Sequence, residues 1–108
     1  MRKIESLMNA AIKAGKNWSL ANTTVTTEDG VSVVHLHGNK IAEVGDDFVT
    51  VYDGGWQSCT TKSRLNAIIN EFCCSYTDGV FQQQFKWFIR DNKVVHDFIN
   101  GYTFAEFA

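Results

Sequence analysis

The residues best suited to hold a charged ligand lie between positions 56 and 64. Lys62 and Arg64 fall at the start of an expected helix, where the dipole is positive and acidic side chains are usually preferred. Thr60 and Thr61 add hydroxyls beside the free N–H groups of that helix start. Trp56 precedes them with a ring that can stack on a base or pack in the core. The combination favours an anion such as a phosphate or a carboxylate.

A second candidate surface comes from the acidic middle of the chain. Its carboxylates are Glu43, Asp46, Asp47 and Asp53. Such a surface would suit a host enzyme or a defence complex as the partner. The same acids supply an alternative to the anion site, because Asp53 or a neighbour would neutralise Lys62 and Arg64 inside the chain.

The histidines form a third, weaker constellation. His35 and His37 lie two apart on a predicted strand, which places them on the same side. Together with His96 they would make a three-histidine metal site. The spacing dictates no nearby acid, however, and the alternative is a set of polar surface histidines. We therefore expect no metal and no cofactor.

Catalytic motifs are absent from the sequence. No GxSxG element accompanies a nucleophile, and Gly54-Gly55 fits neither the Walker A pattern nor the dinucleotide fingerprint. The odd number of cysteines, Cys59, Cys73 and Cys74, does not indicate a secreted disulfide framework. We expect three free thiols, with Cys73 in the core, and a protein that is not an enzyme.

Two segments that must position these residues have helical periodicity. The first apolar stripe comprises Ile4, Leu7, Met8, Ala11 and Ile12, and Gly15 follows as a C-cap. The second comprises Leu65, Ile68, Ile69, Phe72 and Cys73, with Thr60 or Thr61 as the N-cap. Each helix would bury a single face.

Strand patterns fill the rest of the chain. Turn signals separate strands at 23–27, 31–37, 40–44 and 48–52, and two more strands are expected at 80–89 and 93–98. Within 80–89, alternation would place Phe81, Phe85, Trp87 and Ile89 on one face. The sequence therefore predicts an α+β fold in the order α-β-β-β-β-α-β-β. We expect one domain, 1–108, in which both helices cover one face of an antiparallel sheet of five to six strands.

Composition limits the classes of function. The chain has 108 residues, 44% of them hydrophobic, and this is enough to build a core without disulfides or metal. Its formal net charge of −2 argues against a protein that coats DNA by bulk electrostatics. The N-terminal segment has no apolar core of a signal peptide, and no segment reaches the length of a membrane span. An intracellular protein that contacts no membrane is expected.

Several segments together carry a family resemblance. LHGNKIAEVG (36–45) and YDGGWQSCTTKSRLNAI (52–68) resemble a group of short tailed-bacteriophage proteins, and the segments 1–25 and 80–89 fit that group as well. The most specific part is GGW followed closely by TTKxRLNAI. The resemblance implies a phage accessory protein made in an infected bacterium, and it implies no catalytic residues.

These observations lead to one functional hypothesis with an alternative. The first is a non-enzymatic phage accessory protein in the host cytoplasm that binds nucleic acid through Trp56, Thr60, Thr61, Lys62 and Arg64. The alternative is an inhibitor that binds a host protein through its acidic surface. Either would act as a monomer or a small homo-oligomer.

Overall fold

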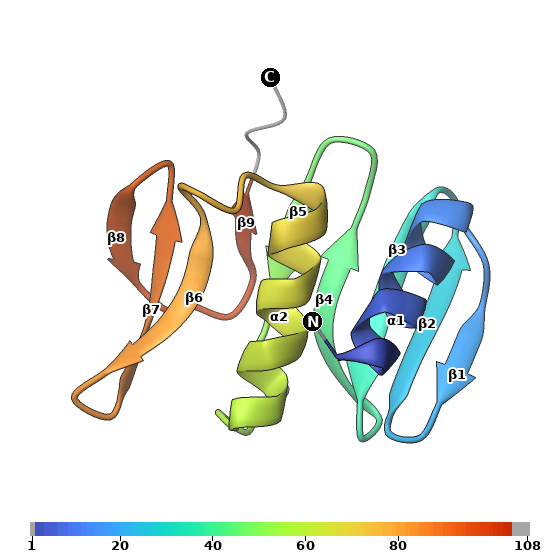
Figure 1. The fold of residues 1–108 in the computed structure, drawn as a ribbon, viewed down its shortest axis with the longest axis horizontal. Coiled ribbons are helices and arrows are strands. Elements are labelled where there is room, and N and C mark those ends of the chain that lie inside the picture. Colours follow the sequence, from blue (N-terminus) through green and yellow to red (C-terminus); the bar gives the residue numbers. More distant parts are fainter. Residues whose placement is uncertain (1, 105–108) are drawn as a thin grey trace.

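The computed structural model describes residues 2–104, which form two helices and two antiparallel sheets (Figure 1). The helices are α1 (Lys3–Ala14) and α2 (Cys59–Phe72). The larger sheet has the strand order β1 (Trp18–Leu20), β2 (Thr23–Glu28), β3 (Val31–Leu36), β4 (Asn39–Val44), β5 (Val49–Val51) and β9 (Tyr102–Phe104). The smaller sheet consists of β6 (Gly79–Gln83), β7 (Lys86–Asp91) and β8 (Val94–Asp97). The predicted α+β class is confirmed.

Helix α1 buries most of the predicted apolar stripe, but it also buries two polar residues. Met8, Ala11 and Ile12 are buried, but Leu7 is exposed, whereas Glu5 and Asn9 are buried beside the apolar residues. Gly15 ends the helix as predicted, with a φ of 64° that favours glycine. The helix thus presents two polar side chains to the interior, and both need partners there.

Helix α2 begins earlier than expected. Its N-cap is Ser58, whose Oγ accepts a hydrogen bond of 3.1 Å from the Thr61 N–H, so Thr60 and Thr61 lie inside the helix. The prediction of a threonine cap was wrong because serine has the same capping chemistry two residues upstream. Leu65, Ile68 and Ile69 are buried as predicted.

The segment 80–89 is a hairpin and not a single strand. Gln84 and Phe85 form its turn with φ values of 52° and 66°, and the Phe85 side chain is 96% exposed. Phe81 pairs with Phe88 on the sheet face opposite to Trp87 and Ile89. The predicted four-residue face was therefore wrong, because a turn without glycine or asparagine interrupts the alternation.

One hydrophobic core unites the helices with both sheets. Both helices lie on the same side of the larger sheet in Figure 1, as predicted. Met8 and Ile68 pack there with Val34 and Val51, and Trp87 and Ile89 join from the smaller sheet. No helix among residues 2–104 is long and apolar enough to cross a membrane.

Candidate binding site

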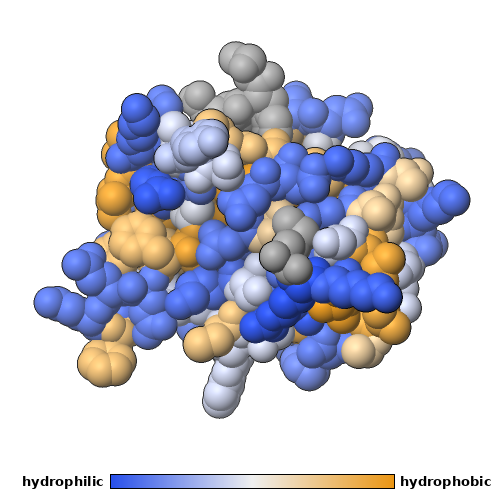
Figure 2. Space-filling view, in the orientation of Figure 1, coloured by the Kyte–Doolittle hydropathy of each residue, from blue (hydrophilic) through white to orange (hydrophobic). Residues whose placement is uncertain are grey.

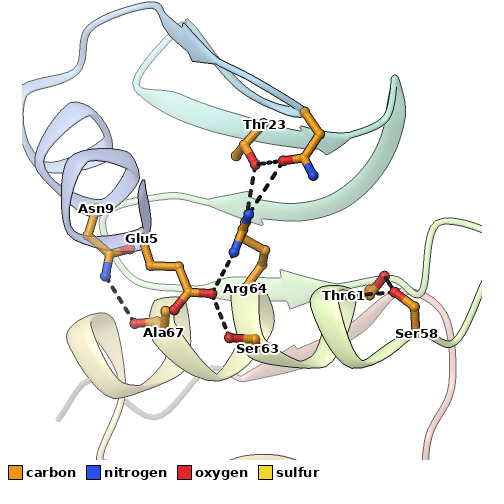
Figure 3. A network of polar contacts seen from close by, with 9 residues as sticks. Glu5, Asn9, Thr23, Ser58, Thr61, Ser63, Arg64 and Ala67 are labelled. Carbon is orange, nitrogen blue, oxygen red and sulfur yellow. Dashed lines mark hydrogen bonds and ion pairs between the residues drawn. The ribbon is translucent and has the colours of Figure 1, made fainter. Parts of the chain in front are cut away.

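The structure places Arg64 in the interior rather than at a ligand site. Its side chain is buried, and its Nη1 lies 2.8 Å from Oε2 of Glu5 (Figure 3). Its Nε donates to the Thr23 hydroxyl at 3.1 Å, and Nη2 donates to the Asn22 side chain at 3.4 Å. Ser63 donates a further hydrogen bond of 2.6 Å to Glu5. Arg64 is therefore removed from the predicted anion site, because its charge is already neutralised.

Thr61 is also unavailable to a ligand. It is buried, and its hydroxyl lies 2.9 Å from that of Ser58 and 3.3 Å from the carbonyl oxygen of Trp56. Thr60 and Lys62 are half-buried, and Lys62 has no ion-pair partner among residues 2–104. Anion binding by Thr60 and Lys62 stays a prediction.

Glu5, and not Asp53, is the acid that neutralises this part of the helix. Asp53 instead accepts hydrogen bonds from the Gly55 N–H at 2.8 Å and from the Gln57 amide at 3.3 Å. A signal for Glu5 was present in the sequence, since it precedes Met8 by three residues and Ile12 by seven. An acid on an apolar helix stripe requires a buried cationic partner.

Asp53 shapes the turn 53–57, which we call the Trp56 loop. Gly54 and Gly55 have φ values of 70° and 84°, a region that glycine adopts without strain. A Cβ on Gly54 would lie 3.2 Å from Cγ2 of Ile41 and 3.3 Å from Cβ of Asn39. The loop therefore rests directly on β4, and a larger residue at 54 would push it away.

The backbone of the Trp56 loop is fixed while its indole ring is free. The Trp56 N–H donates to the Asp53 carbonyl at 3.3 Å, and the Trp56 carbonyl accepts from the Ser58 N–H at 3.0 Å. The Trp56 side chain is nevertheless 75% exposed. A large aromatic side chain is thus exposed to solvent on a turn whose backbone is hydrogen-bonded.

Two adjoining hollows surround this turn. The first, of about 290 Å³, lies between the loop, the β3–β4 turn and the start of α2, and its apolar wall is Leu36, Ile41 and Trp56. The second, of about 260 Å³, shares Asn39, Asp53 and Gly54 with it. A larger hollow of about 430 Å³ lies elsewhere, between the end of α1 and turns of the larger sheet, and it presents no exposed aromatic side chain. The segments 36–41 and 53–61 therefore meet around one partly apolar depression.

Lys40 and Glu43, next to this depression, offset each other within the chain. The Tyr52 hydroxyl donates a hydrogen bond of 2.6 Å to Glu43, and this bond, together with burial, raises the pKa of Tyr52 to about 12. The Lys40 ammonium lies 4.4 Å from the centre of the Tyr52 ring and 3.8 Å from Glu43. Lys40 and Glu43 together therefore offer little net charge to attract a polyanion.

The four predicted acidic residues do not form one compact face. Asp46 and Asp47 are exposed in the β4–β5 turn, Glu43 is engaged by Tyr52 and Lys40, and Asp53 follows the opposite end of β5. At about 3.3 Å per extended residue, the chain from Asp47 to Asp53 spans at most roughly 20 Å. Binding of a host protein through these four residues stays a prediction, and β5 lies between Asp47 at one end and Asp53 at the other.

The three histidines are also dispersed. His35 is half-buried on β3, and His37 is exposed with a φ of 53°. The strand therefore ends before His37, and its alternation does not place the two histidines on one side. His96 lies in the smaller sheet, with its ring 5.6 Å from that of Tyr102. Residues 2–104 contain no group of three or more histidine, cysteine or acidic side chains able to hold a metal ion. The cysteines are free, and burial raises the pKa of Cys73 to about 12.

Comparison with known proteins places the chain in a family. Searches of curated proteins and of solved structures each found no match. A family model described as Kyanoviridae Gp96 protein, which represents phage proteins, matches residues 1–105. Since this match covers nearly the whole chain, the protein belongs to the Kyanoviridae Gp96 family of phage proteins.

Proposed function

We propose that the protein is a non-catalytic accessory protein that binds a host protein in the cytoplasm of the infected cell. Its contact surface is the Trp56 loop with the two hollows beside it. The observation that carries the proposal is the Trp56 side chain, 75% exposed on a turn whose backbone is hydrogen-bonded on both sides. Tryptophan is among the residues that contribute most to protein interfaces when a partner covers them.

The character of the hollow favours a protein over a nucleic acid. Its wall combines Leu36, Ile41 and Trp56 with polar groups at its rim, which suits an apolar side chain from a partner. The charges at Lys40 and Glu43 offset each other, and Arg64 is buried. Phosphate contacts would therefore depend on Lys62 and on His37, which lies in the β3–β4 turn.

Nucleic acid is the second candidate, and one observation favours it. Lys62 has no acidic partner among the described residues, and it lies on the first turns of α2, close after Trp56 in the chain. An exposed aromatic ring and a cation that can reach the same strand are the minimal arrangement for contact with single-stranded nucleic acid. In this case Trp56 would stack on a base while Lys62 contacts a phosphate.

A capture experiment separates the two candidates. The full chain, immobilised through a tag, is exposed to lysate of the infected host with and without nuclease. We expect a host protein to be retained after nuclease treatment by the wild type and by Tyr76→Ala, but not by Trp56→Ala. Tyr76 is the matched control, because it is 89% exposed and lies in the loop after α2.

The outcomes are mutually exclusive. Release of all retained material by nuclease, with loss of capture in Lys62→Glu, would support the nucleic-acid candidate and contradict the protein partner. Equal capture by Trp56→Ala and the wild type would contradict any role of the Trp56 loop. Circular dichroism of each variant verifies that the fold is unchanged.

A further inference from the structure

The smaller sheet has one face in the core and one face turned away from it. Strand pairing places Val80, Trp87 and Ile89 on the same face, and all three are buried in the hydrophobic core. Phe81 on β6 and Phe88 on β7 lie directly across from each other on the opposite face, which we call the outer face. Figure 2 shows apolar surface bordered by hydrophilic residues on the left, where the smaller sheet lies in Figure 1.

Two stacked aromatic rings form the apolar part of the outer face. The ring centroids of Phe81 and Phe88 are 5.5 Å apart, and the ring planes make an angle of 23°. Both side chains are half-buried, and neither belongs to the hydrophobic core that residues 2–104 form or to the side chains packed against it. Core packing therefore does not account for this pair of rings, and each remains partly open to solvent.

Cations flank the rings in both directions along β7. Lys86 and Arg90 lie two residues before and two residues after Phe88, on the same face and roughly 13 Å apart. The Lys86 ammonium lies 5.6 Å from the centre of the Phe88 ring. Among the residues that strand pairing places on this face, the acid is Asp97, opposite Phe88. The outer face is thus locally cationic, although the whole chain has a formal net charge of −2.

Both cations are available to an external anion. Lys86 lies 3.2 Å from Asp97, but the two side chains are 60% and 63% exposed, and an ion pair as exposed as this contributes little. Arg90 has no ion pair among residues 2–104, and its buried Nε has no hydrogen-bond partner there. A guanidinium with unused donors is well suited to a phosphate group.

This combination of groups matches the chemistry of a single nucleic-acid strand. Unpaired bases stack on aromatic side chains of a sheet, whatever the base, and the phosphates between them meet neighbouring cations. A duplex keeps its bases stacked within the helix and offers mainly phosphates to such a surface, and two cations alone bind a duplex weakly. The rings therefore favour a single strand, and the cations favour a polyanion.

We propose that the outer face of the smaller sheet binds single-stranded nucleic acid. About two or three bases would stack on Phe81 and Phe88, while Lys86 and Arg90 hold the phosphates. Stacking supplies most of the affinity, which agrees with a chain whose net charge is not basic. The site is separate from the Trp56 loop, and the inference does not rest on the proposed host-protein partner.

Fluorescence anisotropy with labelled oligonucleotides tests the site. The full chain is titrated with oligo(dT), oligo(U) and a DNA duplex of the same length. We expect a single strand to bind at least roughly tenfold more tightly than the duplex, because only unpaired bases reach the rings. Binding of either single strand supports the proposal, and the tighter of the two identifies DNA or RNA as the ligand.

Variants of the outer face separate stacking from charge. Phe81→Leu/Phe88→Leu keeps the face apolar but removes both rings, and it should weaken binding roughly tenfold or more. Lys86→Gln and Arg90→Gln should each reduce the slope of log affinity against log salt concentration by about 0.7, the value for one phosphate of a single strand. Lys16→Gln, at an exposed residue outside both sheets, is the matched control and should change neither quantity. Circular dichroism verifies the fold of each variant.

Three results would overturn the proposal. The first is the absence of binding to both single strands at low salt, and the second is equal affinity for the duplex and the single strands. The third is binding that Trp56→Ala abolishes but that Phe81→Leu/Phe88→Leu and Lys86→Gln leave unchanged, which would place the nucleic acid at the Trp56 loop. Failure of the host-protein capture leaves this test intact, because the titration uses the pure chain without lysate.

Discussion

Two regions of the molecule break the rule that polar residues lie outside and apolar residues inside. They are the polar layer between the two helices and the Trp56 loop. The polar layer, formed by Glu5, Asn9, Thr23, Ser63 and Arg64, places charges inside, and each charge has a partner there. The Trp56 loop places a large aromatic ring outside, where the described residues leave it 75% exposed. Paired polar groups in the interior fix how the helices and strands pack, whereas an exposed apolar side chain indicates a surface that binds a partner.

Two cations in the same helix illustrate the difference. Lys62 and Arg64 are separated by about 200° around the helix axis, so one faces outward when the other faces the core. Arg64 reaches Glu5, 59 positions earlier in the chain, and α1 is thereby tied to α2. The sequence provides no reason to assign different roles to the two cations. Only the tertiary ion pair with Glu5 shows that Arg64 is structural.

The largest effect is expected from breaking the polar layer. Arg64→Met leaves the Glu5 carboxylate buried without its cation, and we expect the free energy of unfolding to fall by about 3–5 kcal/mol. Equilibrium denaturation with urea measures the change. The double variant Glu5→Leu/Arg64→Met should recover part of the loss, because it removes both charges. A single variant as stable as the wild type would show that the pair contributes nothing.

A smaller effect is expected from forcing the Trp56 loop off β4. Gly54→Ala meets both an unfavourable φ of 70° and a close approach to Ile41, and it should destabilise the fold by about 1–2 kcal/mol. Gly55→Ala is the matched control, because its φ of 84° is similarly unfavourable but nothing lies within 4 Å of a Cβ there. Thermal denaturation of both variants isolates the contact with Ile41. Equal losses would mean that the loop does not rest on β4 in solution.

The sequence was sufficient for the fold class because its signals are local. Apolar residues at helical spacing identified both helices, and turn signals identified β2 to β5. Strands β1 and β9, of three residues each, were not predicted, whereas β5, which is equally short, was found because a turn signal precedes it. The β6–β7 turn was missed because Gln84 and Phe85 adopt positive φ without the usual glycine or asparagine.

The candidate site was only partly predictable for a different reason. Trp56 and the two glycines before it stand out by residue type, and the structure places them together at a hollow. Arg64 was misassigned because its partner lies in a distant segment, and no spacing rule connects 5 with 64. Which backbone groups of β8 face outward likewise follows only from the observed pairing with β7.

A pH-dependent effect is expected beside the Trp56 loop. The hydrogen bond to Glu43 raises the pKa of Tyr52 from its ordinary 10 to about 12 in the folded chain. The neutral phenol therefore contributes stability that is fully present below pH 10 and is lost as the pH rises through 12. The stability difference between the wild type and Tyr52→Phe, measured by urea denaturation, should shrink over that range. A constant difference would show that Tyr52 is not held by Glu43.

The smallest effect is expected at Lys62, and it completes the comparison with Arg64. Lys62 is half-buried in the first turns of α2 and has no acidic partner among residues 2–104, so Lys62→Glu breaks no ion pair described there. An acid also suits the positive end of the helix dipole better than a cation does. The free energy of unfolding should therefore stay within about 0.5 kcal/mol of the wild type or rise slightly. Urea denaturation of Lys62→Glu and Arg64→Met under the same conditions compares the contributions of the two cations to the free energy of unfolding. A loss at Lys62 comparable to that at Arg64 would mean that both cations serve the interior, and Lys62 would then be unavailable to any partner.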